Sequence, residues 1–314
     1  PSAAAPAAPT VTRIDGCRSC GARDLRPVLD LGAMPLADRL PRTPPDPADP
    51  EPRFPLEVAG CPACGLVQLL HTVDPGTLFR DDYPYYSSFS DHLLAHARDH
   101  ARELVAARGL GPDSLVVEIA SNDGYLLRWF AEEGIPVLGV DPAEGPAAAA
   151  EEIGIPTRCD FFTERFAGEL ADEGGPADVI LASNVLAHVP DPNDLVAGIR
   201  RLLRPGGVAV LEFPYLRDLV EHCEFDTIYH EHMGYFSMTA LDALFRRHHL
   251  VPADVRRIAI HGGSLRLTVA HGSPRAIARS AARRLLAEER ADGIDRTEWL
   301  ADFPGRVHRP RHPL

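Results

Sequence analysis

The chain has 314 residues, of which 45% are hydrophobic, and a formal net charge of −13 at pH 7. This apolar content can build a sizeable core, and no apolar run has the length of a membrane span, so we expect a cytoplasmic protein without a membrane partner. The acidic balance argues against a nucleic-acid partner, because phosphates are bound by clustered basic side chains. All 32 basic residues are Arg, which excludes a lysine Schiff base.

Changes of composition divide the chain into six segments. The first is rich in Ala and Pro and is expected to be disordered, and the second is short, Pro-broken and strand-like. An aromatic stretch and a helix at about 90–108 lead into a long stretch in which short apolar runs alternate with helical patterns. The predicted boundaries are 1–12 for the lead-in, 13–75 for a zinc-binding module, 76–112 for a bridge, 113–272 for the main domain, 273–302 for a helical extension and 303–314 for a disordered tail.

Two Cys-x-x-Cys pairs define the second segment, and each is followed by a glycine that lets backbone amides turn toward the thiolates. The four cysteines are Cys17, Cys20, Cys61 and Cys64. Four thiolates at such spacing favour a tetrahedral Zn²⁺ site with no position open for chemistry, hence a structural metal. The alternatives are two disulfides, which are rare in cytosolic chains, or a redox pair, although neither pair opens a helix beside a βαβ strand.

The main domain is predicted to be α/β, with a doubly wound, Rossmann-like parallel sheet. Its strands are expected at 114–119, 137–140, 177–182 and 208–213, with a turn at 203–207 before the last strand. A helix at 239–248, a hairpin made of 253–260 and 264–270, and a helix at 274–291 are expected to follow. The hairpin turns on His261-Gly262-Gly263.

The first turn of this domain has the character of a cofactor site. A strand that carries Glu118 runs into a tight turn, where methyltransferases usually have glycines at the positions of Ala120, Asn122 and Gly124, and only the last is glycine here. A nicotinamide cofactor is the competing hypothesis, but its pyrophosphate requires a helix N-terminus without the negative charge of Asp123. S-Adenosylmethionine has no phosphate and carries a positive sulfonium, so the acidic turn favours a class I methyltransferase domain that binds it.

The expected cofactor contacts lie on this turn and at the ends of the later strands. Asp141 ends the second strand and is expected to hold the ribose hydroxyls, and Asp160 and Phe161 are expected to flank the adenine. Glu118 has an alternative role in ordering the loop, and Asp141 has one as a turn residue. The full predicted set is Glu118, Ala120, Ser121, Asn122, Gly124, Tyr125, Asp141, Asp160, Phe161 and Asn184.

Reactive side chains gather after the fourth and fifth strands. His188 either faces a substrate at the carboxyl edge of the sheet or caps the helix that starts near Asp191, and the residues favour neither. The segment Glu224 to His232 holds five ionisable side chains and a phenol within nine residues, which is unusual for a solvated loop. His230 and His232 share a face if the segment is extended and could bind a metal, although no third ligand is suggested nearby.

Several strings of residues closely resemble the bacterial sugar C-methyltransferases that make branched deoxysugars. The resemblance covers Cys17 to about Ala270. The strings are Cys61 to Gln68, Tyr83 to Ser88, Glu118 to Tyr125, Asn184 to Asp191, Glu212 to Tyr215, Glu224 to His232 and His261 to Arg266.

The resemblance implies methyl transfer from S-adenosylmethionine to a carbon next to the ketone of a dTDP-4-keto-6-deoxyhexose, typically the third carbon and in some members the fifth. A general base removes the proton α to the carbonyl, and hydrogen-bond donors stabilise the enolate. By the same resemblance His232 is the base, and Glu231 orients it. Tyr229, Tyr83 and His188 line the sugar and donate to the enolate oxygen.

The family continues beyond the position of Leu314 into a C-terminal Rossmann-like domain that helps to hold the nucleotide sugar. We expect this chain to lack that domain and to be a monomer. Two other functions stay open at this point. One is a zinc-ribbon RNA methyltransferase, and the other is a non-catalytic relative that binds the cofactor but no nucleotide sugar.

Overall fold

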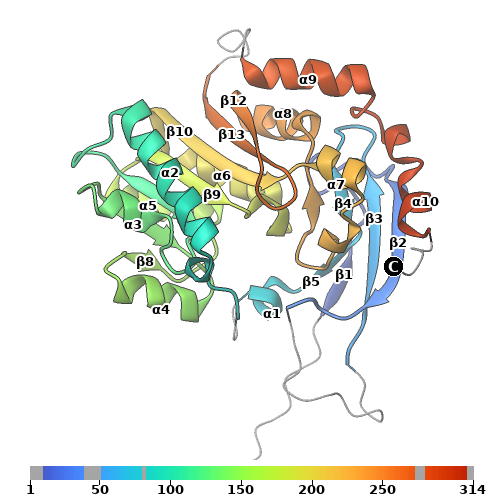
Figure 1. Cartoon of the computed structure of the whole chain (residues 1–314), viewed down its shortest axis with the longest axis horizontal. Helices are drawn as coiled ribbons and strands as arrows, with labels where there is room; N and C mark the ends of the chain where they lie inside the picture. The colour runs from blue at the N-terminus through green and yellow to red at the C-terminus, as the bar shows by residue number, and fades with distance from the viewer. Residues whose placement is uncertain (1–9, 39–50, 80–82, 273–279, 310–314) are drawn as a thin grey trace, which may run out of the picture.

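The computed structural model describes residues 10–38, 51–79, 83–272 and 280–309, which form a large sheet domain beside a smaller, four-stranded sheet (Figure 1). Most of the expected lead-in, the start of the helix expected at 274 and the last five residues of the expected tail lie outside the described residues. No helix within the described ranges combines the length and the apolar composition that a bilayer crossing requires.

The large sheet has seven strands in the order β12-β13-β10-β9-β6-β7-β8. β13 is antiparallel to both of its neighbours, and the remaining pairs are parallel. The strands are β6 (Val116–Ile119), β7 (Val137–Val140), β8 (Thr157–Arg158), β9 (Ala177–Ser183), β10 (Leu203–Pro214), β12 (Leu250–Ile258) and β13 (Ser264–His271). The predicted Rossmann-like fold is confirmed. The turn expected at 203–207 is instead an irregular start of β10, where the pairing with β9 shifts register between Leu203 and Val208.

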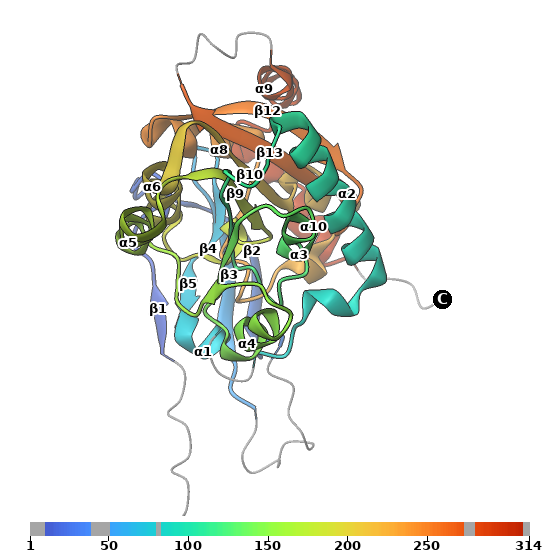
Figure 2. The same cartoon turned by 90° about the vertical axis from the view of Figure 1, so that its left-hand side faces the viewer.

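Alternate residues of the buried strands pack into two different cores, because successive side chains of a strand point to opposite faces. Ile180 and Leu211 pack with α5 and α6 on one face, whereas Val179 and Val210 pack with α2 and α3 on the other. Figure 2 shows these helix layers on the two sides of the sheet. The described helices are α1 (Pro75–Phe79), α2 (Asp91–Arg108), α3 (Leu127–Ala131), α4 (Glu144–Glu152), α5 (Glu164–Gly174), α6 (Pro192–Leu202), α7 (Leu216–His222), α8 (Met238–Arg247), α9 (Ala281–Asp292) and α10 (Phe303–Val307).

Local capping signals explain why the helix predicted at 90–108 begins and ends where it does. The side chain of Ser90 accepts a hydrogen bond from the backbone N–H of Leu93, and Gly109 ends α2 with a left-handed φ of 60°. The helix predicted at 239–248 is confirmed as α8, and the predicted hairpin is confirmed as β12 and β13.

The four-stranded sheet joins distant parts of the chain. Its order is β11-β4-β3-β2, with all neighbours antiparallel, and a separate two-stranded sheet pairs β1 with β5. The strands are β1 (Val11–Arg13), β2 (Arg26–Met34), β3 (Phe54–Gly60), β4 (Val67–Leu69), β5 (His71–Val73) and β11 (Gly234–Tyr235). Because β11 follows Glu224 to His232 directly, its pairing with β4 fixes that reactive segment against the cysteine module.

Two segments expected to be disordered are ordered in part. Val11, at the end of the expected lead-in, begins β1 and pairs with Val73. The expected tail begins with α10, which contacts β2, and Phe303 is buried there at 3% exposure. Strand pairing at Val11 and burial of Phe303 stabilise these two places, which lie in an Ala/Pro-rich and an Arg/His/Pro-rich segment.

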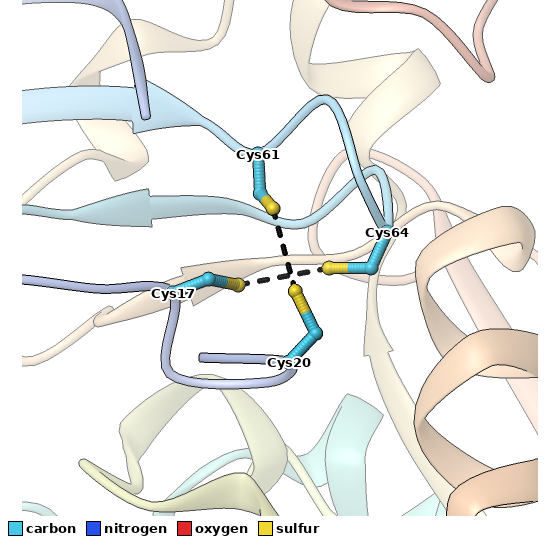
Figure 3. Close-up of side chains that lie close together, drawn as sticks. All are labelled: Cys17, Cys20, Cys61 and Cys64. Atoms are coloured by element: carbon cyan, nitrogen blue, oxygen red, sulfur yellow. Dashed lines mark hydrogen bonds between the residues drawn. The ribbon is translucent and has the colours of Figure 1, made fainter. Parts of the chain in front are cut away.

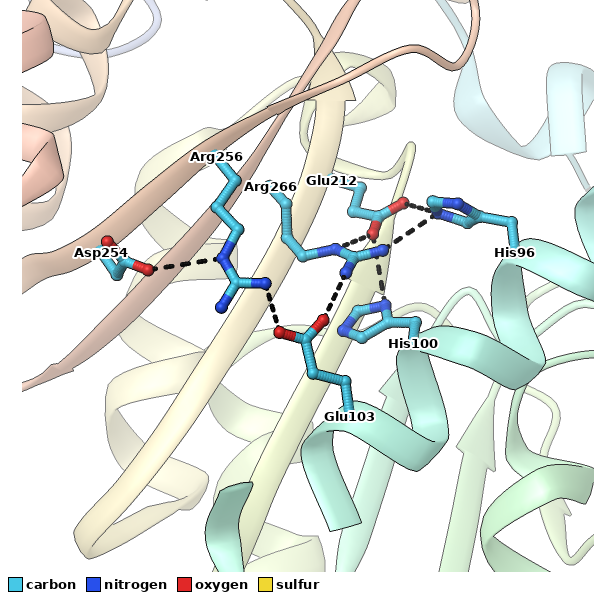
Figure 4. Close-up of polar contacts among 7 residues, drawn as sticks. All are labelled: His96, His100, Glu103, Glu212, Asp254, Arg256 and Arg266. Atoms are coloured by element: carbon cyan, nitrogen blue, oxygen red, sulfur yellow. Dashed lines mark hydrogen bonds and ion pairs between the residues drawn. The ribbon is translucent and has the colours of Figure 1, made fainter. Parts of the chain in front are cut away.

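A buried ionic network fastens α2 to the large sheet (Figure 4). The carboxylate of Glu212 on β10 bonds His96 Nε2 at 2.8 Å and His100 Nδ1 at 3.2 Å, both from α2, and it accepts from Arg266 Nε of β13. Burial raises the pKa of Glu212, but the two histidines and Arg266 outweigh it and hold the pKa well below its usual range. The network thereby sets the position of the segment that precedes α2, which lies at the cofactor turn.

Candidate active site and metal centre

The four cysteines predicted to bind zinc come together between the two Cys-x-x-Cys turns (Figure 3). The Sγ atoms of Cys17 and Cys64, and those of Cys20 and Cys61, are 3.6 Å apart, and all four lie within 4.8 Å of one another. Zn–S bonds of about 2.3 Å in a tetrahedron separate the sulfurs by about 3.8 Å, so the cluster fits Zn²⁺. Gly21 and Gly65 have φ of 75° and 78°, as the turns require.

The electrostatics of the cluster agree with a bound cation as the partner of four thiolates. Burial, together with the charge of Cys17, raises the pKa of Cys61 to about 11, so four thiolates cannot coexist without a positive ion among them. The module is also attached to the sheet domain. The side chain of Asn193, at the start of α6, donates to the carbonyl oxygens of Arg18 and Ser19 at 2.8 and 3.0 Å.

The turn after β6 keeps the backbone of a glycine-rich turn although two of the three glycines are missing. Ala120, Asn122 and Gly124 have φ of 53°, 49° and 75°, all in the left-handed region. Ala pays about 1–2 kcal/mol for this conformation, whereas Asn tolerates it because its side chain bonds to nearby backbone. The substitutions therefore changed the composition of the turn and not its path.

Asn122 and Asp123 use their side chains to hold the aromatic bridge over this turn. The amide of Asn122 accepts from the backbone N–H of Ser87 at 2.8 Å and donates to the carbonyl of Tyr85 at 3.0 Å. The carboxylate of Asp123 accepts from the backbone N–H of Ser88 at 3.1 Å. A glycine at position 122 could not make the two contacts of the Asn122 side chain, which gives the departure from the usual turn at that position a physical reason.

A cleft of about 900 Å³ opens at the carboxyl edge of the large sheet. Seven of the ten predicted cofactor residues line it: Ala120, Asn122, Tyr125, Asp141, Asp160, Phe161 and Asn184. The carboxylate of Asp141 accepts from the backbone N–H groups of Asn122 and Ala143, both at 2.8 Å, which aims it into the cleft edge. Burial raises the pKa of Asp141 to about 6.

The other three predicted cofactor residues do not line the cleft. Glu118, Ser121 and Gly124 are buried behind the turn. Both carboxyl oxygens of Glu118 lack a hydrogen-bond partner among the described residues, and burial raises the pKa of Glu118 well above its usual range.

All five residues predicted to act on the substrate line the same cleft: Tyr83, His188, Tyr229, Glu231 and His232. His232 Nδ1 lies 2.7 Å from the carbonyl oxygen of Thr227, and Nε2 lies 3.0 Å from the phenol oxygen of Tyr229. Because a carbonyl only accepts, Nδ1 carries the hydrogen and Nε2 is the basic nitrogen. Burial lowers the pKa of His232, which keeps the ring neutral.

His188 faces the cleft and does not cap α6. Its ring packs edge-on against His232 at 4.7 Å and against Phe79 at 5.6 Å between centroids. The N-cap of α6 is Asp191, whose carboxylate accepts from the backbone N–H groups of Asn193 and Asp194. Burial holds the pKa of His188 well below its usual range, so it is a neutral hydrogen-bonding group.

Glu231 differs from the expectation that it orients the base. The Thr227 carbonyl holds the His232 ring, whereas the carboxyl of Glu231 is hydrogen-bonded to Asp38, from the segment that follows β2. Burial and the neighbouring Asp38 raise the pKa of Glu231 to about 8. Burial, with the charges of Glu231 and Asp38, also raises the pKa of Tyr83 and Tyr229.

His230 is turned away from His232 and does not form the metal site that their spacing allowed. Its Nε2 lies 3.2 Å from the carbonyl oxygen of Phe54 on β3. Within the described ranges, the four cysteines are the group of His, Cys, Asp and Glu side chains whose ligand atoms are close enough to hold a metal.

The sequence patterns did not identify several groups that form the cleft. Thr227 orients the base through its backbone, and Asp38, Asp74 and Phe79 bring the cysteine module to the cleft wall. His261, which lies at the predicted hairpin turn and in one of the resembling strings, also lines the cleft. A wall built from two sheets has no local sequence signature, so only a resemblance to known motifs could have indicated it.

Two family models match the chain in the same order as the two sheets. Residues 17–79 match the family described as "Putative zinc binding domain". Residues 91–252, which are 162 of the 314 residues, match the family described as "Methyltransferase domain". The second match includes the turn after β6 and the segment Glu224 to His232.

Individual relatives extend this result. C-methyltransferase NovU of Streptomyces niveus is 37% identical over 301 residues, which cover 96% of this chain and 71% of NovU. An uncharacterized methyltransferase of Mycobacterium leprae is 30% identical over 138 residues, which cover 43% of this chain and 51% of that protein. Magnesium protoporphyrin IX methyltransferase from Synechocystis, solved with bound SAH, is 16% identical, with a TM-score of 0.46 over 57% of this chain and 83% of its own.

Proposed function

Because the chain belongs to the S-adenosylmethionine-dependent methyltransferases and is related over 96% of its length to a C-methyltransferase, we propose that it methylates the carbon α to the ketone of a dTDP-4-keto-6-deoxyhexose, at C-3. The sugar is the substrate class that the motif resemblance implies. The observation that carries the proposal is the orientation of His232, whose basic Nε2 lies in the cleft that also contains the cofactor residues.

The residues of the cleft divide the chemistry between them. His232 removes the α-proton as a neutral imidazole, and the neutral His188 and the phenols of Tyr83 and Tyr229 supply hydrogen bonds to the enolate oxygen. In this proposal Asp141 is the acceptor for the ribose hydroxyls, and Asp160 and Phe161, which also line the cleft, flank the adenine. When bound, S-adenosylmethionine supplies an electrophilic methyl group on a positive sulfonium.

The charge of the cleft decides which part of the substrate enters it. Among the described residues that line it there is no Arg, whereas eight are Asp or Glu. A diphosphate is bound by cationic side chains, so we expect the neutral sugar ring to enter the cleft and the diphosphate to stay outside. The same charge disfavours an RNA substrate.

Nuclear magnetic resonance of the substrate tests the proposal. Purified zinc-loaded protein and a dTDP-4-keto-6-deoxyhexose in heavy water should exchange the α-proton for deuterium, and addition of S-adenosylmethionine should add one methyl group at C-3. His232→Ala should lose both reactions and still bind S-adenosylhomocysteine. His92→Ala removes an exposed imidazole outside the cleft and should behave as wild type. Wild-type protein that binds the cofactor but neither exchanges nor methylates the sugar would contradict the proposal, and methylation of RNA would replace it.

A further inference from the structure

Asp38 enters the cleft from the zinc-binding module and meets Glu231, which comes from the methyltransferase domain. Both line the cleft. Glu231 is buried at 3% exposure, whereas Asp38 is exposed, and their carboxyl groups are hydrogen-bonded to each other. Two carboxyl groups form such a bond only when they share a proton, so the pair holds one negative charge and one carboxylic acid.

Burial decides which partner is the acid. A charge costs far less on a solvated carboxylate than on a desolvated one, so the charge belongs to exposed Asp38 and the proton to buried Glu231. The groups that face Glu231 agree with this. They are Asp38 from the module and the phenols of Tyr83 and Tyr229, and none of these described neighbours is a cation that would stabilise an ionised Glu231.

We propose that Asp38 is a positioning residue that keeps Glu231 in its protonated form, so that Glu231 donates its carboxylic proton to the carbonyl oxygen of the substrate while His232 removes the α-proton. The inference rests on the proposed function for its substrate and adds a proton donor and its partner. It also gives the zinc-binding module a direct part in the reaction, because that module supplies Asp38.

The proton balance of the step is closed. The C–H bond next to the carbonyl breaks as an N–H bond forms at Nε2 of His232, and the electron pair moves toward the carbonyl oxygen. The O–H bond of Glu231 breaks as an O–H bond forms on that oxygen, which leaves an enol, an imidazolium and a Glu231 carboxylate. When the carbonyl is restored as the carbon acquires its methyl group, the proton returns to Glu231, and the imidazolium later loses its proton to water.

The phenols in the cleft are weaker acids than Glu231. Burial and the single negative charge of the Asp38–Glu231 pair raise the pKa of both Tyr83 and Tyr229 above their usual range, whereas the pKa of Glu231 is about 8. A general acid works best when its pKa is near the working pH. The phenols therefore suit hydrogen bonding to the oxygen, and Glu231 suits proton donation.

A pH profile of α-proton exchange distinguishes this role from a merely structural one. In the wild type, exchange should fall above about pH 8, where Glu231 loses its proton. Asp38→Asn should move that decline to lower pH, and a pKa of Glu231 that is one unit lower should reduce exchange at pH 8 by about fivefold. Asp38→Glu should restore the wild-type profile. Glu231→Gln should abolish the decline, and Asp38→Asn should then have no further effect. Asp24→Asn, which removes an exposed carboxylate elsewhere on the module, is the matched control.

An equal loss at every pH, or the same loss in the Glu231→Gln background, would overturn the proposal. Infrared spectroscopy tests the Asp38–Glu231 carboxyl pair independently of the identity of the substrate. At pH 7 the free enzyme should show, besides the band of buried Glu118, a second protonated carboxyl band that is absent in Glu231→Gln and weaker in Asp38→Asn. If the sugar is inert but this band is present, the substrate is wrong and the carboxyl pair stands. If the band is absent, the pair is wrong whatever the substrate.

Discussion

The imidazole of His232 is held between the carbonyl oxygen of Thr227, 2.7 Å from Nδ1, and the phenol of Tyr229, 3.0 Å from Nε2. Burial lowers the pKa of this histidine, so its basic form persists below pH 6.5. We therefore expect the rate of α-proton exchange to stay constant from neutral pH down to about 6.5 and to decline only below it. A decline that begins above that pH would contradict the assignment of His232 as the base.

Cofactor affinity should depend on the ionisation of Asp141. Its pKa is raised to about 6 by burial, and only the ionised carboxylate offers all its lone pairs to the ribose hydroxyls. Calorimetry with S-adenosylhomocysteine should show an affinity that falls as the pH drops through about 6. Asp141→Asn should bind more weakly and without that dependence, whereas an unchanged dependence in the variant would exclude Asp141 as its source.

The left-handed turn predicts opposite effects for two small substitutions. Ala120→Gly relieves the strain at φ of 53° and should stabilise the protein by up to about 1 kcal/mol in urea unfolding. Gly124→Ala should destabilise it, because φ there is 75° and the new Cβ would lie 3.1 Å from Cγ1 of Ile155. If both substitutions shifted the midpoint in the same direction, the turn would have another conformation in solution.

The ionic network around Glu212 should be sensitive to loss of its buried cation. Arg266→Met leaves the carboxylate buried with two histidines and should cost about 3 kcal/mol in urea unfolding at pH 7. Arg256→Met removes an exposed partner of Glu103 and should cost less than about 1 kcal/mol. Because the pKa of Glu212 is held below its usual range, its contribution to stability should be present above about pH 4.5 and disappear as the pH falls further.

Zinc removal should impair the substrate side of the cleft and leave the cofactor side able to bind its ligand. Chelation should release one metal ion per chain and abolish α-proton exchange, because Asp38, Asp74 and Phe79 belong to the wall that the zinc-binding module supports. Binding of S-adenosylhomocysteine should persist, because Asn122 and Asp141 lie on the other sheet. Cys64→Ser should reproduce the effect, and Cys159→Ser, at an exposed thiol, should not. Loss of cofactor binding on chelation would show instead that the two sheets unfold together.

The parts of the fold and site that could be predicted are those with a local signal. The strands around Glu118 and Asp141 have continuous apolar runs, and parallel strands bring their carboxyl ends to one edge, so the cofactor side of the cleft followed from the sequence. The orientation of His232 could not be predicted from the sequence, because the backbone carbonyl of Thr227 sets it and every residue has such a carbonyl. The pairing of Asp38 with Glu231 depends on a contact between the two sheets, which neither segment encodes alone.

The acidic lining of the cleft has a consequence for turnover. Methyl transfer converts a positively charged sulfonium into an uncharged thioether, so the attraction between the carboxylates and the cofactor is largest before the reaction and vanishes after it. We therefore expect S-adenosylmethionine to be bound more tightly than S-adenosylhomocysteine. Inhibition by the thioether product should be weak at low ionic strength. It should become stronger, relative to binding of the sulfonium cofactor, as salt screens the attraction between the carboxylates and the sulfonium.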